Sequence, residues 1–148
     1  MKAPLLVQMD LLGPTGRSMD AHRLARLAEL DQGERPLVLV AERPTRWAPT
    51  RSRVDGAFSR QAEVEAELRR AGGNLDAVLY LDLGLFGRRG QLRESLADLA
   101  NRYAVELADV RAVMTEGRLS EALRDVVGTV TIVSDEDAFD AALKEARV

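Results

Sequence analysis

The sequence predicts a single α/β domain built on a parallel sheet. Apolar runs of strand length alternate with amphipathic segments of helix length along the 148-residue chain, a pattern typical of βαβ units. In the clearest of these runs every successive position is apolar, and not only every second one. This indicates a sheet covered by helices on both faces. No repeat, low-complexity tract or linker interrupts this order, so we predict one domain over residues 1–148.

The first half of the chain opens with a predicted buried strand that ends near Asp10. Residues 20–31 then place apolar side chains at helical spacing, and residues 37–41 are all apolar, which makes them the clearest strand. Ser59 is a residue type that favours helix N-caps, so we expect a second helix to begin there. It is expected to end at the glycine pair 72–73, a usual C-terminal signal.

The second half of the chain continues the alternation in shorter units. Residues 91–104 form the clearest amphipathic stripe here, with leucines and a tyrosine on one helical face. Gly128 ends a short helix, and Ser134 is the predicted cap of the last one. The expected elements are strands at 77–81, 112–114 and 129–133, and helices at 91–104, at 119–126 and from Ser134 onward.

Composition excludes several classes of protein. The chain has no cysteine, which excludes disulfides, thiolate metal sites and a cysteine nucleophile and agrees with a reducing cytoplasm. Its one histidine, His22, lies on the polar side of its helix and is expected at the surface. A net charge of −3 disfavours nucleic-acid binding. No apolar run reaches the ~20 residues that span a membrane, and the first residues do not resemble a signal peptide. We expect a cytoplasmic protein with no membrane association.

Asp10 is the first candidate for chemistry. It ends the first strand and is followed by the turn residues Gly13 and Pro14. Ligands of open α/β sheets bind at the carboxyl ends of the strands, so Asp10 is placed to face a ligand. Its alternative role is to cap the turn, since Asp and Gly are common turn residues.

The segment Asp10-Leu11-Leu12-Gly13-Pro14 resembles the first motif of the haloacid dehalogenase-like (HAD) superfamily. In that family the first strand ends in Asp-x-Asp-Gly-Thr, whose first Asp is the phosphoryl-accepting nucleophile and whose second is the general acid/base. The resemblance implies that Asp10 keeps the nucleophile position and that Leu12 occupies the acid/base position. A leucine cannot transfer a proton, a role worth roughly a hundredfold or more in rate.

The other family motifs are also altered. The second strand ends in Ala41-Glu42, where the family has a phosphate-binding Thr or Ser. Phe86 falls on the position of the family's lysine, and Arg88 two residues later could supply the charge. Glu116 and Glu121 stand in place of the aspartates that hold Mg²⁺.

The resemblance extends over nearly the whole chain and is greatest to the small uncapped branch of D,D-heptose 1,7-bisphosphate phosphatase and histidinol-phosphate phosphatase. It implies a HAD-like Rossmannoid three-layer sandwich with a five-stranded parallel sheet, ordered 3-2-1-4-5, and no cap domain. If a metal binds, its implied ligands are Asp10, Glu116 and Glu121. Of the two alternatives, bound Mg²⁺ or no cofactor, we favour no cofactor. The absence of cysteine excludes the zinc loop that this branch often carries.

An arginine-rich segment at residues 43–53 is the second candidate site. It holds four arginines and Trp47 but no acidic residue. Together with Arg88 and Arg89, its Arg43 and Arg46 would form an anion site for a small ligand or a protein partner. The alternative is a solvated loop that Trp47 anchors to the domain or to a second copy of the chain.

Two functions follow from these motifs. In the first, the chain is a degenerate phosphatase homologue, catalytically inactive or impaired, that acts as a binding or interaction module. In the second, it is a Mg²⁺-dependent phosphomonoesterase, a hydrolase with Asp10 as nucleophile. The missing acid/base, hydroxyl and lysine favour the first. Both predict that Asp10, Glu42 and Glu116 lie together at the carboxyl ends of the strands.

Overall fold

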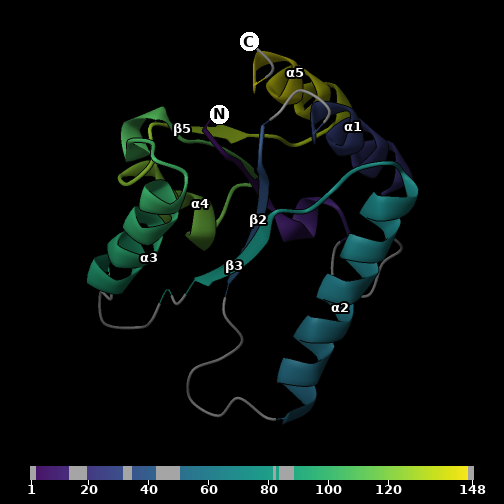
Figure 1. Cartoon of the computed structure of the whole chain (residues 1–148), viewed down its shortest axis with the longest axis horizontal. Coiled ribbons are helices and arrows are strands. Elements are labelled where there is room, and N and C mark those ends of the chain that lie inside the picture. Colours follow the sequence, from purple (N-terminus) through teal and green to yellow (C-terminus); the bar gives the residue numbers. More distant parts are fainter. Residues whose placement is uncertain are drawn as a thin grey trace.

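The protein is a five-stranded parallel sheet between two layers of helices (Figure 1). The computed structural model describes residues 3–13, 20–31, 35–42, 51–81, 83 and 89–146, with the side chains of 31, 51–58 and 89–91 outside this description. The strand order is β3-β2-β1-β4-β5 and every pairing is parallel, which confirms the predicted fold class and order. The strands are β1 Leu5–Gln8, β2 Leu37–Glu42, β3 Ala77–Leu81, β4 Arg111–Met114 and β5 Thr129–Ile132.

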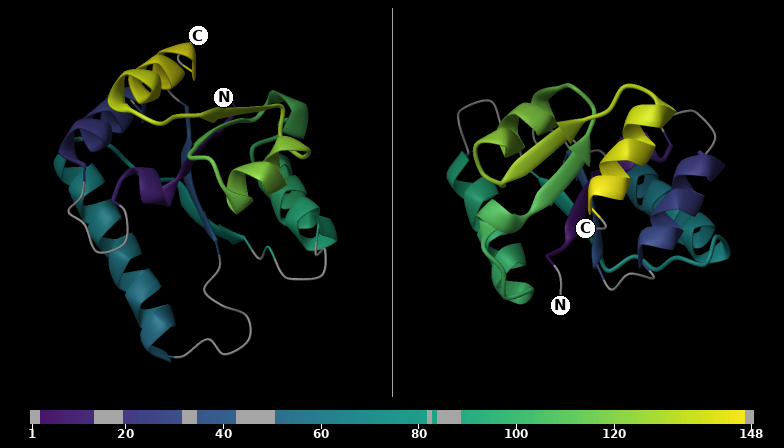
Figure 2. Two further views of the ribbon diagram at one scale, coloured as in Figure 1. Left: turned by 180° about the vertical axis from the view of Figure 1, so that it is seen from behind. Right: turned by 90° about the horizontal axis from the view of Figure 1, so that it is seen from above.

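Helices cover both faces of the sheet, as its apolar strands require. Figures 1 and 2 show α1, α2 and α5 on one face and α3 and α4 on the other. The helices are α1 Ala21–Asp31, α2 Arg51–Arg70, α3 Arg89–Arg102, α4 Arg118–Arg124 and α5 Glu136–Ala146, with short 3₁₀ turns η1 Met9–Leu11 and η2 Leu107–Asp109.

Each face of the sheet has its own hydrophobic core. Leu5 and Val7 of the central strand β1 belong to the core under α1, α2 and α5, whereas Leu6 between them belongs to the core under α3 and α4. All three side chains are fully buried. Each such side chain stabilises the fold by about 1.5–3 kcal/mol relative to an exposed one, so β1 is held firmly and its carboxyl end is fixed.

The predicted start of the second helix is wrong. The helix expected from Ser59 begins at Arg51, so Ser59 is not its cap. Arg51 and Arg53 of the arginine-rich segment are therefore helical. Ser59 was misleading because serine also occurs inside helices, and the one glycine in this stretch, Gly56, costs only about 1 kcal/mol in a helix of 20 residues.

The predicted glycine signal at the end of α2 is accurate. Gly72 has φ of +90°, and the N–H of Gly73 donates to the Leu68 carbonyl at 2.9 Å, which confirms the glycine pair as the end of α2. The cap of α5 was placed one residue too early. Asp135, not Ser134, accepts the capping bond, from the Ala138 N–H at 2.7 Å. Among the described helices, none is both long and apolar enough to cross a membrane.

Candidate functional site at the carboxyl edge of the sheet

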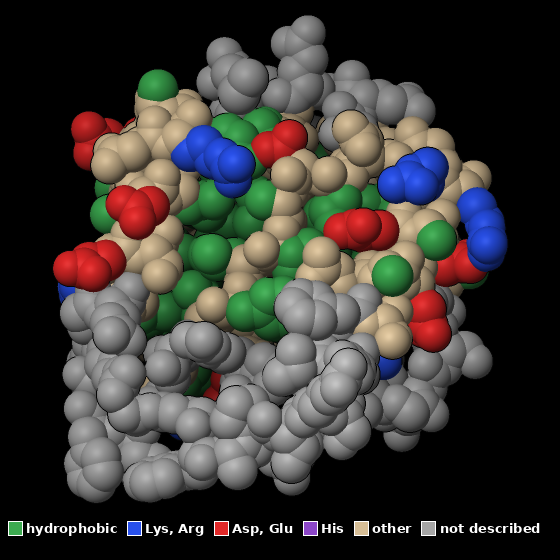
Figure 3. Space-filling view, turned by 60° about the horizontal axis from the view of Figure 1, so that its bottom comes forward, with side chains coloured by type: hydrophobic (Ala, Val, Ile, Leu, Met, Phe, Trp, Pro, Cys, Tyr) green, Lys and Arg blue, Asp and Glu red, His purple; other side chains and the backbone are tan. Residues whose placement is uncertain are grey.

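The candidate site lies at the carboxyl edge, which we define as the edge where the parallel strands end. Asp10 follows β1 within η1, Glu42 is the last residue of β2, and Glu116 follows β4. Because β2 and β4 pair with β1 on its two sides, the three carboxylates come from adjacent strands at one edge. Figure 3 shows this face, with hydrophobic side chains in the middle and charged side chains around them.

Asp10 and Leu12 have opposite environments. Asp10 is exposed, whereas Leu12 has no exposed surface and belongs to the core under α1, α2 and α5. Backbone bonds hold Leu12 there. Its N–H donates to the Met9 carbonyl at 3.0 Å, and its carbonyl accepts from the Asp20 N–H at 2.7 Å. A side chain at position 12 is therefore directed into the core, and one at position 10 is directed to solvent.

Arg23 fixes the turn that carries these two residues. Its Nη1 donates to the Leu11 carbonyl at 2.8 Å, and its Nε forms an ion pair with Asp20 at 3.3 Å. Its guanidinium also lies over the Phe139 ring, 5.2 Å from the centroid. The turn after β1 is thus tied to α1 and α5.

An ion pair connects the end of β2 to the start of α4, the helix that follows β4. Arg118 Nη1, at the start of α4, lies 3.2 Å from Glu42 Oε1 at the end of β2. Both side chains are largely exposed, at 63% and 46%, so the pair stabilises the fold by at most about 1 kcal/mol. Glu116 has a similar partner, Arg124, at 3.4 Å. Glu42 and Glu116 are therefore each paired with an arginine. Because the Glu42–Arg118 pair is weak, an anion that replaced Glu42 as the partner of Arg118 would forfeit little stabilisation.

Gln8 is a site residue that the sequence analysis missed. Its Oε1 accepts hydrogen bonds from the Thr115 N–H at 3.0 Å and from the Thr115 hydroxyl at 3.3 Å. These bonds tie the end of β1 to the segment that follows β4. A single polar residue at the end of an apolar run was the available signal. Arg118 was missed too, although it lies between Glu116 and Glu121.

Several solved structures resemble this chain at low identity. No protein-family model matches the sequence, and no curated protein sequence does. A protein from Mesorhizobium loti assigned to the HAD-like phosphatases shares 15% identity at a TM-score of 0.67, over 99% of this chain and 86% of that one. The chain has the HAD-like fold.

Two further structures show how widely this fold is shared. The cobalt-bound deoxy-D-mannose-octulosonate 8-phosphate phosphatase from Haemophilus influenzae matches with 10% identity and a TM-score of 0.53, over 99% of this chain and 86% of that one. The universal stress protein from Archaeoglobus fulgidus in complex with dAMP matches with 15% identity and a TM-score of 0.54, over 88% of this chain and 95% of that one. Identities this low establish the fold alone.

The predicted metal ligands lie at or near one edge of the sheet but do not form a cluster. Within the described residues, no three Asp, Glu, His or Cys side chains lie close enough together to hold a metal ion. Glu116 and Glu121 are both exposed, as Asp10 is. This arrangement does not fit a preformed Mg²⁺ site, and the role of the three carboxylates as metal ligands stays a prediction.

The predicted anion site of the HAD-like domain falls almost entirely outside the described residues. This applies to Arg43, Arg46, Trp47 and Arg88. Arg89 is the first residue of α3, and its side chain is outside the description. The arginine-rich site therefore stays a prediction.

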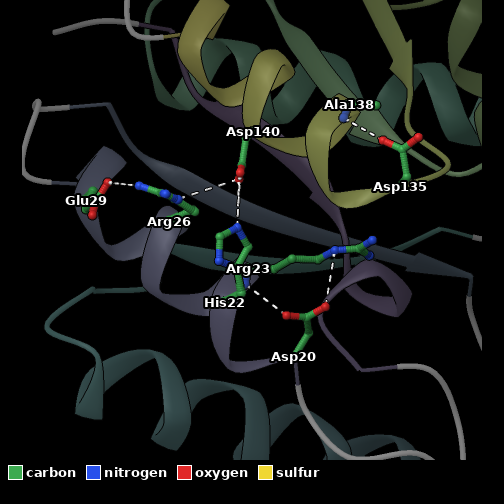
Figure 4. A network of polar contacts seen from close by, with 8 residues as sticks. All are labelled: Asp20, His22, Arg23, Arg26, Glu29, Asp135, Ala138 and Asp140. Carbon is green, nitrogen blue, oxygen red and sulfur yellow. Dashed lines mark hydrogen bonds and ion pairs between the residues drawn. The ribbon is translucent and has the colours of Figure 1, made fainter.

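His22 is exposed, as predicted, and it joins two helices. Its Nε2 lies 3.1 Å from Asp140 of α5, and Arg26 lies 3.7 Å from the same carboxylate. Figure 4 shows this network between α1 and α5. These contacts hold α1 against α5, which is a structural role.

Proposed function

We propose that this HAD-like chain is a phosphatase homologue that lacks catalysis, or retains very little, and acts as a binding module. The observation that carries the proposal is the complete burial of Leu12. The resemblance assigns this position to the general acid/base. A group there must reach the leaving oxygen at hydrogen-bond distance, whereas the backbone at position 12 directs its side chain into the core.

The second motif supports the same proposal. Ala41 has no hydroxyl to donate to a phosphate, and Glu42 beside it is engaged with Arg118. Hydrogen-bond donors aimed at the developing charge are commonly the largest single contribution to catalysis. Loss of the acid/base and of this donor together would remove several kcal/mol, on the order of 4–7, of transition-state stabilisation.

We propose a small phosphate-bearing molecule as the ligand of the carboxyl edge. Arg118 is an exposed guanidinium whose present partner holds it weakly, and guanidinium forks match phosphate oxygens well. A protein of similar fold, the universal stress protein, was solved with dAMP, a nucleotide that carries one phosphate. A cysteine-free chain is compatible with the cytoplasm, where we place this function.

Binding is tested by titrating ¹⁵N-labelled protein with dAMP, and with 2′-deoxyadenosine as the arm that lacks phosphate. We expect amide shifts at residues 8–12 and 115–118 with dAMP and none with 2′-deoxyadenosine. Arg118→Gln should weaken binding about tenfold, the effect of losing one charge-assisted hydrogen bond. Glu42→Gln should strengthen it, because Arg118 then has no competing carboxylate. Arg70→Gln, another exposed arginine paired with a glutamate, is the matched control and should change nothing.

Absence of shifts at the carboxyl edge at millimolar dAMP would contradict the proposal and favour a protein partner. Shifts with deoxyadenosine as well would contradict the phosphate as the recognised group.

The alternative function is a Mg²⁺-dependent phosphomonoesterase. The exposure of Asp10 favours it, since a nucleophile must be accessible to its substrate. It would need a proton shuttle other than position 12.

A further inference from the structure

Two arginines flank the start of β1, at the edge of the sheet opposite the candidate site. Leu5, the first residue of β1, pairs with Leu37 of β2 on one side and with Arg111 of β4 on the other. The Leu5 N–H also donates to the Pro36 carbonyl at 2.9 Å, so the pairing extends beyond β2 towards Arg35. We call this the amino edge.

Both arginines belong to the same face of the sheet. Side chains alternate between faces along a strand, so Arg35 shares a face with Leu37, and Arg111 shares a face with Val113. Leu37 and Val113 both lie in the core under α1, α2 and α5. The two arginines therefore extend over one face from either side of β1, and their long side chains can approach each other there.

Arg35 is buried and only partly satisfied. It is 8% exposed, and its Nη1 donates to the Ala3 carbonyl at 2.9 Å. Its Nε is buried with no hydrogen-bond partner. Burial lowers the pKa of Arg35, and the positive charge of Arg111 lowers it further.

In the part of the chain that the structure describes, neither arginine forms an ion pair with a carboxylate. A buried charge is normally paired, because an unpaired one is costly to remove from water. The C-terminal ends of α1 and α5 lie at this edge (Figure 1), and their partial negative charges offset part of the repulsion. Among the side chains that the structure describes, no carboxylate supplies a full counter-charge.

We propose that Arg35 and Arg111 form a second anion site, which binds a tetrahedral oxyanion such as inorganic phosphate or sulfate at the amino edge. Two guanidinium groups supply several N–H donors and the positive charge that such an ion needs. The bond to Ala3 holds Arg35 in place before the ion arrives, so little side-chain freedom is lost on binding. This site is separate from the carboxyl edge and does not depend on the function proposed for it.

The experiment compares thermal unfolding of the full chain in sodium phosphate and in sodium chloride at equal ionic strength and pH. For the wild type we expect a higher Tm in phosphate, because an ion that binds only the folded state stabilises it by mass action. Arg111→Gln should lose most of that increment and keep only the part that the carboxyl edge and the general exclusion of phosphate from protein surfaces supply. In chloride the same variant should be at least as stable as the wild type, because the repulsion on Arg35 is gone. Arg35→Lys keeps the charge but loses the fork, and it should weaken phosphate binding about tenfold.

Arg70→Gln is the matched control, since it removes one exposed arginine that belongs to neither proposed site and should keep the increment. Amide shifts on phosphate titration should appear at residues 3–5, 35 and 111 in this variant as in the wild type. The proposal is wrong if phosphate gives no increment over chloride, if Arg111→Gln retains all of it, or if Arg70→Gln alone removes it. A purely structural role for Arg111 would lower the Tm equally in both salts.

Discussion

Replacing Leu12 with aspartate would restore the acid/base of the family motif and remove a fully buried side chain from the core. Leu12 has no exposed surface and packs with the core under α1, α2 and α5. Losing its burial costs about 1.5–3 kcal/mol, and enclosing a poorly paired polar group there adds about 1–3 kcal/mol. We expect Leu12→Asp to lower the free energy of unfolding by about 3–5 kcal/mol, a large part of the 5–15 kcal/mol of an average domain.

The assay is urea unfolding at neutral pH, followed by circular dichroism. Leu12→Met keeps the volume and should cost less than about 1.5 kcal/mol, and Asp10→Asn on the exposed side of the same turn should stay within about 0.5 kcal/mol of the wild type. Burial raises the pKa of an introduced carboxyl group above its unfolded value of about 4, so the deficit should shrink as pH falls from neutral towards about 4 and stay constant below that. A Leu12→Asp protein as stable as the wild type would show that position 12 is open to solvent and would remove the main support for lost catalysis.

Two further predictions concern the rest of the fold. Burial and a hydrogen bond to Asp76 raise the pKa of Tyr103 to about 12. Between pH 10 and 12 the unfolded chain loses this proton more readily than the folded chain, so the stability of the wild type falls as pH rises. The stability of the Tyr103→Phe variant should fall less over the same range. Equal losses in the urea midpoint of the two proteins would contradict this. A Cβ at Gly128 would lie 1.8 Å from the Ala108 carbonyl oxygen, whereas one at Gly117 meets nothing within 4 Å. Gly128→Ala should therefore cost at least about 2 kcal/mol and Gly117→Ala much less, and equal Tm values would show that the backbone yields.

The sequence was sufficient to predict the sheet because its strands are buried on both faces. Runs such as residues 37–41 can satisfy their apolar side chains only between two helical layers, and the predicted order 3-2-1-4-5 followed from the family resemblance. The start of α2 could not be predicted in the same way. Val54, Ala57 and Phe58 do stand at helical spacing before Ser59, but the cap signal of Ser59 was given more weight and decided the prediction wrongly.

The candidate site was predictable in its position and less so in its contacts. Asp10, Glu42 and Glu116 follow strands, and a parallel sheet brings such residues to one edge. The pairing of Glu42 with Arg118 depends on the start of α4, which no local pattern relates to the end of β2. The Arg35–Arg111 pair has the same origin, since only the register of β1 between β2 and β4 brings the two residues to one edge.

We proposed that this chain lacks a working phosphatase site, and the most direct test is turnover of p-nitrophenyl phosphate by the purified chain with Mg²⁺. The wild type and Asp10→Asn are compared at equal concentration, with the buffer rate subtracted. We predict that both rates equal the buffer rate, because the acid/base position is a core leucine and the second motif offers no hydroxyl. Saturable, Mg²⁺-dependent turnover by the wild type that Asp10→Asn abolishes would contradict the account and establish the phosphomonoesterase.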